Sequence, residues 1–329
     1  MTRILSYNIL AGGERRIHQL TNIISSAQPD IVGLVEANNP RIVEQIAQNL
    51  GMHFRMSENY TQYYKGQVAL LSRLPIVETR AHYFANRRIS SLLEACIEEE
   101  DGHKLLIYVT HLTAAFSQSR GGDGQRCREV QDILRITASN KATPHLVMGD
   151  FNAIAPGDRL QASSLLRYLL IMDQKYRRNP HRDLGHPNLN SVIPKPLRFL
   201  YPWMKTISRN KFLSALVDKT GSLYASRRSI HLLRKAGYID CFRVKNPNDP
   251  GFTCPAGSLA GRIDYIFASP ELAERLSACY RITEGNGLRS EEASDHLPVV
   301  AEFAEHAKVA NGPAYELSTH RPVDRVDNA

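Results

Sequence analysis

The sequence predicts a mixed α and β domain in which strands outnumber helices, and three observations support this class. Short apolar runs such as 31–35, 68–72 and 146–148 have the length and composition of buried strands. Between them, stretches such as 14–27 carry apolar residues at the spacing of an amphipathic helix. Polar residues repeatedly follow the apolar runs, at the strand ends where open sheets place their binding crevices.

Each element has its own local signal along the chain. The triplet Gln28-Pro29-Asp30 ends the first helix, and Asp101-Gly102 is typical of a hairpin turn. Apolar runs and alternation predict strands at 3–9, 31–35, 68–72, 76–83, 91–99, 104–112, 146–148, 262–269 and 278–283, and a last strand ending at 303. Helical spacing predicts helices at 14–27, 40–50, 125–139, 159–170 and 229–236.

The composition is that of a soluble globular protein, with 329 residues, 43% of them hydrophobic and 22% charged. The chain has no apolar run long enough to span a membrane, and we expect no signal peptide at its start. Its five cysteines are scattered without a CxxC pair, which argues against a zinc site and against a disulfide framework. We therefore expect a cytoplasmic protein.

The net charge of +8 is unevenly distributed along the chain. Residues 160–235 contain 15 Lys and Arg but only 3 Asp and Glu, so this segment carries +12 and the remainder carries −4. From 171 to 225, prolines stand among basic and aromatic residues, including the single tryptophan Trp203, and no regular pattern is evident. This basic, aromatic-rich segment suggests an anionic partner.

Three interpretations of the basic segment remain open. Cations that meet phosphates and rings that stack on bases would make it a nucleic-acid surface. Alternatively, the stretches 197–203 and 212–217 would enter the headgroup region of a membrane. The third interpretation is an insertion packed on the scaffold, with its Lys and Arg side chains in solvent.

One stretch, 144–153, carries the most chemical information. Residues 146–148 predict a buried strand, Gly149 allows the backbone to turn, and Asp150 and Asn152 follow at a spacing of two. On an extended chain, that spacing points both side chains to the same side. A carboxylate beside a carboxamide suits the activation of a water molecule. The alternative is an Asp-x-Asn turn that caps a loop.

Further polar residues end or follow the other apolar runs, namely Asn8, Glu36, His111 and Asp264. Asp295 and His296 instead stand where the last strand opens. Polar residues from separate strands suggest one crowded crevice, where neighbouring carboxylates repel each other unless a cation joins them. Oxygen ligands without cysteine suit Mg²⁺ or Mn²⁺ rather than zinc.

Six short segments, in their order along the chain, resemble the motifs of the endonuclease/exonuclease/phosphatase (DNase I-like) superfamily. They are Ser6-Tyr7-Asn8, Leu34-Val35-Glu36, Thr110-His111-Leu112, Gly149-Asp150-Phe151-Asn152, Arg262-Ile263-Asp264-Tyr265 and Ser294-Asp295-His296-Leu297-Pro298. The resemblance covers about 1–160 and 230–303. It implies an α+β fold, a four-layered α/β/β/α sandwich with two mixed β-sheets packed face to face and helices outside. The catalytic domain would span 1–303, with the basic insertion at about 171–225, and 304–329 would form a loose tail.

The resemblance also implies how a metal ion and the substrate are held. Glu36 would be the main carboxylate ligand of Mg²⁺ or Mn²⁺, with Asn8 and Asp295 assisting. Arg262 is expected to bind substrate. The alternative for Arg262 is a purely structural ion pair with Asp264.

The catalytic roles that the resemblance implies involve five side chains. Asp150 would orient or deprotonate the attacking water, and Asn152 would hold Asp150 or a phosphate oxygen. His296 would donate to the phosphoryl oxygen, while Asp264 fixes the tautomer of His296. His111 would also face the phosphate.

These expectations describe a Mg²⁺-dependent phosphohydrolase, a phosphodiesterase or nuclease that cleaves nucleic acid by in-line attack of an activated water. One alternative is a lipid or inositol phosphodiesterase or phosphatase that docks at an anionic membrane surface. Another, of a different class, is a non-catalytic nucleic-acid-binding protein on the same scaffold. No stable protein partner is expected.

Overall fold

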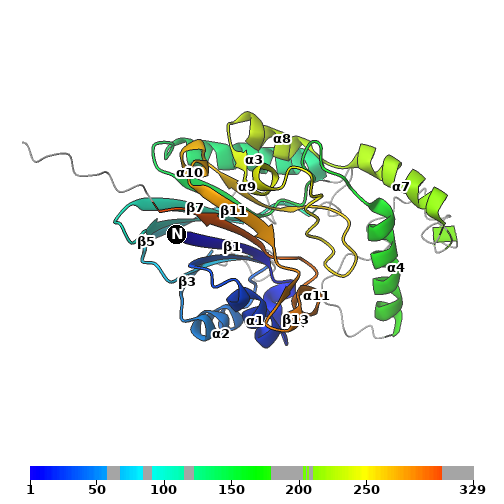
Figure 1. Cartoon of the computed structure of the whole chain (residues 1–329), viewed down its shortest axis with the longest axis horizontal. Coiled ribbons are helices and arrows are strands. Elements are labelled where there is room, and N and C mark those ends of the chain that lie inside the picture. Colours follow the sequence, from blue (N-terminus) through cyan, green and yellow to red (C-terminus); the bar gives the residue numbers. More distant parts are fainter. Residues whose placement is uncertain are drawn as a thin grey trace, which may run out of the picture.

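Two six-stranded sheets lie face to face at the centre of the computed structural model, and helices cover both outer faces (Figure 1). The structure describes residues 1–57, 67–83, 91–114, 122–178, 203–204, 206 and 210–305. The four-layered sandwich is therefore confirmed, with its layers in the order helices, sheet, sheet, helices.

The first sheet has the strand order β11-β14-β1-β2-β4-β3. Its central strand β1 pairs in parallel with β2 and antiparallel with β14. The bounds are β1 Thr2–Asn8, β2 Ile31–Val35, β3 His53–Met56, β4 Val68–Ser72, β11 Leu276–Arg281 and β14 Val299–Phe303. The short edge strand β3 was not predicted from the sequence.

The second sheet has the strand order β5-β6-β7-β8-β10-β9. Strands β7 and β8 are parallel, while β10 runs antiparallel to β8. The bounds are β5 Ile76–Tyr83, β6 Ser91–Glu98, β7 Lys104–His111, β8 His145–Asp150, β9 Ile239–Asp240 and β10 Asp264–Ala268. The parallel pairing of β7 with β8 and the antiparallel pairing of β8 with β10 determine which strand ends lie side by side.

Alternate side chains from both sheets form the core between them. Ile107 and Val109 of β7 and Met148 of β8 belong to this core, together with Ile4 of β1. The sheets approach so closely that a Cβ on Gly33 of β2 would lie 2.5 Å from the Met148 methyl carbon. Because side chains alternate along a strand, every second residue of each strand faces the opposite sheet.

Helices bury apolar stripes on the two outer faces of the sandwich. Helices α1 and α2 cover the first sheet, and α3 and α8 cover the second (Figure 1). The bounds are α1 Ile17–Ser26, α2 Pro40–Leu50, α3 Asp123–Ala138 and α8 Arg228–Lys235. Shorter elements are η1 Ala11–Gly13, α9 Cys241–Lys245, α10 Pro270–Ala273, β12 Glu284–Gly285, β13 Leu288–Arg289 and α11 Ser290–Ala293.

The expectation that 171–225 lacks regular structure was wrong at both ends of that range. Helix α4 continues from Ala162 to Arg178, and a further helix, α7, spans Lys211–Tyr224. The Asn210 side chain caps α7 by accepting hydrogen bonds from two backbone N–H groups of its first turn. Most of the predicted proline-rich stretch lies outside the described residues, as do 306–329 of the tail.

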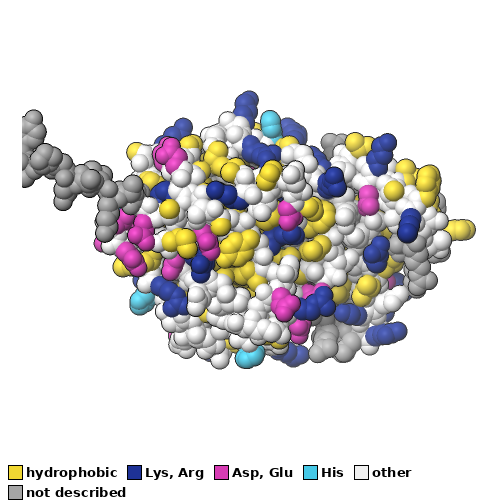
Figure 2. All heavy atoms as spheres, in the orientation of Figure 1, with side chains coloured by type: hydrophobic (Ala, Val, Ile, Leu, Met, Phe, Trp, Pro, Cys, Tyr) yellow, Lys and Arg dark blue, Asp and Glu magenta, His cyan; other side chains and the backbone are white. Residues whose placement is uncertain are grey.

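Helices α4 and α7 lie at one end of the molecule, beyond the edge of the sandwich (Figure 1). At this end, Figure 2 shows dark-blue Lys and Arg side chains beside yellow hydrophobic ones. Within the described part of the chain, no helix combines the length and the apolar character needed to cross a bilayer. The division into a domain at 1–303 with an insertion at 171–225 remains a prediction.

Candidate active site

The alternation that builds the core also carries polar side chains to one end of it. Asn8 ends β1, His111 ends β7 and Asp150 ends β8, each an even number of residues from a core side chain on its own strand. Asp264 begins β10, but β10 runs antiparallel to β8, so Asp264 lies beside Asp150. His111 is the neighbour of Asp150 on the other side. The site is thus the polar end of the core between the sheets.

Asp150 is the centre of this arrangement and is almost completely buried. Asn8 Nδ2 donates to Asp150 Oδ2 at 3.1 Å, and the backbone N–H of Asn152 donates to Asp150 Oδ1 at 2.8 Å. Nε2 of His111 and Nε2 of His296 lie 3.7 and 3.9 Å from the same Oδ2. Burial and the neighbouring Asp264 carboxylate raise the pKa of Asp150 to about 6, although the two imidazoles oppose the shift.

Asn8 connects the carboxylates of Glu36 and Asp150. Its Nδ2 also lies 3.3 Å from Glu36 Oε1, while its Oδ1 accepts the backbone N–H of Leu10 at 3.0 Å. Glu36 follows β2 in a left-handed conformation, with φ of 58°, and its Oε2 accepts the Ala11 N–H at 2.6 Å. In this arrangement Asn8 turns its amide nitrogen to the two carboxylates, and its oxygen is held by the backbone.

His296 and Asp264 form a buried pair behind Asp150. Nδ1 of His296 lies 2.8 Å from Asp264 Oδ2. Burial alone would lower the pKa of His296, but the Asp264 carboxylate holds it well above its usual value. The raised pKa favours the protonated imidazole, whose Nε2 faces Asp150 and Asp295, with Asp295 Oδ1 4.0 Å away.

Asn152 differs from the geometry that its spacing suggested. It adopts a left-handed conformation, with φ of 48°, so the chain after Asp150 is not extended. Its backbone N–H closes a turn onto Asp150, and its Nδ2 donates to the Leu112 carbonyl at 3.0 Å. The Asp-x-Asn turn that the sequence allowed is present, and it lies inside the site because it orients Asp150.

The structure corrects the expected role of Arg262. Its side chain is only 1% exposed, and its guanidinium binds Asp240 through two hydrogen bonds of 2.7 Å and Asp158 through a third of 2.7 Å. It also lies 4.5 Å from the centre of the Tyr265 ring. The prediction that Arg262 binds substrate was therefore wrong, because its donors are committed to buried carboxylates. Arg262 does form a structural ion pair, as the alternative interpretation expected, but its partners are Asp158 and Asp240 instead of Asp264.

Two buried charged side chains of α3, Glu129 and Arg126, hold Thr113, which lies just after the end of β7 at His111. Glu129 of α3 accepts hydrogen bonds from the backbone N–H and the hydroxyl of Thr113. Arg126 of the same helix donates to the Thr113 carbonyl at 2.9 Å. Both charged side chains are completely buried. Their spacing from Val130 and Ile133 places them on the inner face of the helix, but charged residues are rarely expected in a core, so neither was predicted.

Two more side chains near the site were not predicted. Arg16 donates to the carbonyls of Leu10 and Ala293, and so joins the loop after β1 to the segment before Asp295. Tyr168 of α4 is buried, and its pKa is raised by burial and by the negative charge of Asp295. Neither residue belongs to a recognisable motif, so no sequence signal pointed to them.

The Nδ1 atom of His111 has no acidic partner within the described residues. This atom is buried without a hydrogen-bond partner there, while Nε2 of His111 faces Asp150. Of the described side chains, Asp150, Asp264 and His296 offer ligand atoms that all lie within 4.8 Å of one another. Two buried carboxylates at this separation repel each other, and a hard divalent cation nearby would offset that repulsion. This buried cluster could therefore hold a divalent metal ion.

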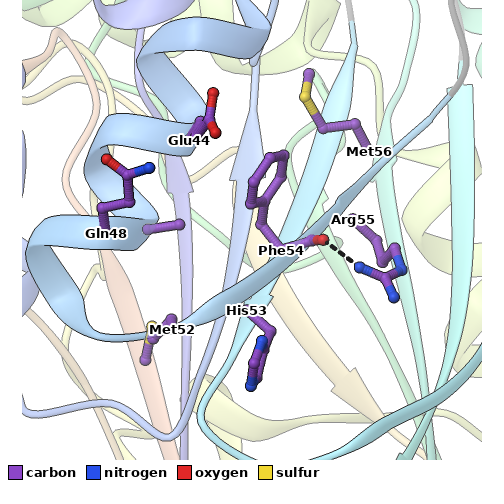
Figure 3. Close-up of a pocket in the computed structure, with 8 residues that line it drawn as sticks. Glu44, Gln48, Met52, His53, Phe54, Arg55 and Met56 are labelled. Atoms are coloured by element: carbon purple, nitrogen blue, oxygen red, sulfur yellow. Dashed lines mark hydrogen bonds between the residues drawn. The ribbon is translucent and has the colours of Figure 1, made fainter.

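A shallow cavity of about 470 Å³ lies away from this site, between α2 and β3 (Figure 3). Glu44 and Gln48 of α2 face Phe54 of β3 across it. Arg55 turns back to donate to the Phe54 carbonyl at 2.9 Å. No residue of the candidate site lines this cavity, so it has no part in the chemistry considered above.

Several known proteins are similar to this chain. Exodeoxyribonuclease III of Haemophilus influenzae is 27% identical over 321 residues, which cover 92% of this chain and 99% of that protein. An AP endonuclease from Archaeoglobus fulgidus superimposes with a TM-score of 0.61 at 18% identity, covering 92% of this chain and 99% of that one. The 3′ phosphatase NExo from Neisseria, bound to a product DNA hairpin, has a TM-score of 0.61 at 16% identity, covering 93% and 100%. The two superpositions confirm the fold.

The model of the Endonuclease/Exonuclease/phosphatase family matches residues 5–296, and five of the six motifs lie entirely within that range. The sixth motif, at 294–298, overlaps its end and contributes His296. The chain therefore belongs to the Endonuclease/Exonuclease/phosphatase family.

Proposed function

We propose that this protein hydrolyses phosphodiester bonds of nucleic acids, using Mg²⁺ or Mn²⁺ and a water molecule as the nucleophile. The observation that carries the proposal is the position of Asp150, which is buried between two imidazoles, an amide and a second carboxylate. The similarity to exodeoxyribonuclease III supports a nucleic-acid substrate, as does the DNA-bound 3′ phosphatase with the same fold.

The residues that would hold the cation are Glu36 and Asp295, with Asn8 positioning Glu36 beside Asp150. A divalent cation supplies charge neutralisation at the phosphoryl group and at the leaving oxygen. Glu36 is the best placed of the carboxylates, because it is partly exposed and is already oriented by the Ala11 N–H. Asp295 lies next to His296, with its Oδ1 4.0 Å from the imidazole Nε2.

Asp150 is suited to accept the proton of the attacking water. Its pKa of about 6 leaves it ionised at neutral pH and still basic enough to take a proton. Asn8 and the Asn152 backbone hold its two oxygens, so its orientation is set before substrate binds. Attack by water in line with the leaving group requires no covalent intermediate.

His296 and His111 are placed to stabilise the charge that develops on phosphorus-bound oxygens. Asp264 keeps His296 protonated and fixes its Nε2–H toward the site, where it donates to a phosphoryl oxygen. His111 presents Nε2 from the neighbouring strand. We infer that Asn152 acts through the turn at Asp150, because its own amide group is tied to the Leu112 carbonyl.

The test is a substrate panel with Mg²⁺, with Mn²⁺ and with EDTA. It contains single- and double-stranded DNA, RNA, inositol phosphates, sphingomyelin vesicles and bis-p-nitrophenyl phosphate. We expect metal-dependent turnover of nucleic acid and of the small diester. Turnover of the lipid or inositol substrates alone would refute the nucleic-acid assignment, and binding of DNA without any turnover would refute catalysis.

Two variants locate the chemistry within the proposed site. Asp150→Ala should lower kcat by at least about a hundredfold while leaving DNA retention intact. The matched control is Asp132→Ala on α3, where the carboxylate pairs at the surface with Arg135 and activity should not change. Glu36→Gln should remove the increase in Tm that Mg²⁺ gives the wild type, because its remaining oxygen carries no charge.

A further inference from the structure

We propose that the exposed face of helix α7 docks the protein on a bilayer containing anionic phospholipid, a property separate from the hydrolysis proposed above. Among the described residues, three of the eight exposed large hydrophobic side chains lie on this one helix. Phe212 is 78% exposed, Leu216 is 52% exposed and Leu223 is 78% exposed. Trp203, which is 66% exposed, belongs to the same insertion.

These three side chains form a stripe along α7 (Lys211–Tyr224). Phe212, Leu216 and Leu223 are separated by four and by seven residues, and such spacings return to one side of an α-helix. Lys219 is exposed beside the stripe, and Lys211 is exposed at the first position of the helix. At a rise of about 1.5 Å per residue, the stripe is roughly 16 Å long.

The opposite side of α7 is already occupied by α4. Asp218 accepts hydrogen bonds from the backbone N–H of Ser163 at 2.7 Å and from its hydroxyl at 3.0 Å. Gly221 lies so close to Ala162 that an added Cβ would be 2.5 Å from the Ala162 Cβ. Asp218 is the only acid in α7, so the outward face combines apolar side chains with lysines and carries no negative charge.

This combination identifies the partner by its chemistry. Leu216 and Leu223 have no ring to stack on a base, so a nucleic acid would leave this part of the stripe unused. A second copy of the chain would cover the apolar stripe but would offer Lys219 no anionic partner, because the outward face of α7 carries no acid. An anionic bilayer fits both the apolar stripe and the lysines, because leucine and phenylalanine enter the headgroup boundary while lysines bind lipid phosphates.

The location of α7 is compatible with docking that leaves the hydrolytic site intact. In Figure 1, α7 projects from one end of the molecule, away from the two sheets. Figure 2 shows hydrophobic and basic side chains exposed together at that end. None of the three stripe residues belongs to the candidate active site, so their substitution should leave turnover of soluble substrates unchanged.

The experiment is vesicle flotation of the full chain with phosphatidylcholine vesicles, with and without phosphatidylglycerol. Wild type should bind only the anionic vesicles, and high salt should weaken binding because charge attraction is screened. Replacing Phe212, Leu216 and Leu223 together by Ser should reduce binding by about tenfold or more. The matched control replaces Val77 and Val244 by Ser, which are similarly exposed elsewhere and should have no effect.

A second variant keeps the result interpretable if the triple variant misfolds. Lys211→Glu with Lys219→Glu leaves the apolar stripe unchanged, and both side chains are exposed; this variant should also abolish binding to anionic vesicles. The proposal is overturned if wild type binds neither vesicle, or if both variants bind vesicles like wild type. It is also overturned if vesicle binding persists in the variants while they lose another interaction of wild type, either DNA binding or association into a dimer. Activity on bis-p-nitrophenyl phosphate, measured without vesicles, tests the hydrolytic function separately.

Discussion

Replacing Arg262 by Met tests whether this residue supports the fold or binds substrate. The guanidinium is buried and makes three hydrogen bonds of 2.7 Å to Asp158 and Asp240, whose side chains are 3% exposed. Methionine fills much of the same space but leaves both carboxylates without this partner. Removing one member of a buried ionic network in this way costs about 3–5 kcal/mol.

The expected loss is large enough to measure by thermal or urea unfolding. For a domain of this size, 1 kcal/mol corresponds to about 2 °C in Tm, so Arg262→Met should lower Tm by roughly 6–10 °C. Below its Tm, the variant should keep the KM of wild type, because Arg262 makes no contact in the site. The matched control is Arg177→Met in the exposed pair with Asp173, where the loss should stay below about 1 kcal/mol.

One result would refute this reasoning. If Arg262→Met unfolds like wild type but raises KM for DNA about tenfold or more, then Arg262 contacts substrate as the sequence first suggested. A partial rescue of Tm in a triple variant that also carries Asp158→Asn and Asp240→Asn would strengthen the structural assignment. These two changes remove the uncompensated buried charges that the single variant leaves behind.

Three further predictions follow from the site. Asp264→Asn should lower the pKa of His296, because the carboxylate that favours the protonated imidazole is lost. The fall of kcat at alkaline pH should then begin at a lower pH than in wild type, and an unchanged alkaline limb of the pH profile would contradict this role. Gly149→Ala should lower the free energy of unfolding by about 3 kcal/mol or more, because φ at Gly149 is 140° and an added Cβ would lie 1.9 Å from the Thr110 carbonyl oxygen. The control Gly102→Ala, which has open space around it, should lower the free energy measured by urea unfolding much less. Glu129→Gln should lower kcat several-fold with little change in KM, since the Thr113 segment beside His111 loses an acceptor; a change confined to KM would argue against a positioning role.

Several elements with strong local periodicity were predicted with their observed bounds, while others, such as the helix predicted at 159–170 and observed at Ala162–Arg178, were not. The strands at 31–35 and 68–72 and the helix at 40–50 are examples of the former, because each combines a clear apolar pattern with a turn signal at its end. The four-residue edge strand β3 was missed, since its pairing with β4 supplies what its short sequence lacks. Helix α7 was missed for a related reason, because its exposed apolar residues obscure the expected amphipathic pattern.

The candidate site shows the same division. The positions of Asn8, His111 and Asp150 at strand ends followed from period-two alternation, and the structure places these side chains together. Arg262 was assigned wrongly because its partners are 22 and 104 residues away in sequence, and no local pattern marks them. The sequence predicted Asn152 on an extended chain. In the structure its conformation is left-handed, because its backbone N–H closes a turn by donating to the Asp150 carboxylate.

The amino-acid sequence alone specified which chemical groups are available and on which face of each strand they lie. That information is local, because side-chain direction in a strand alternates with every residue. Only the tertiary structure decided which strand ends meet. The antiparallel pairing of β8 with β10 and the parallel pairing of β7 with β8 bring Asp264 and His111 to opposite sides of Asp150. The same packing determines which charges are buried with partners, and it separates Arg262, which stabilises the fold, from the residues around Asp150.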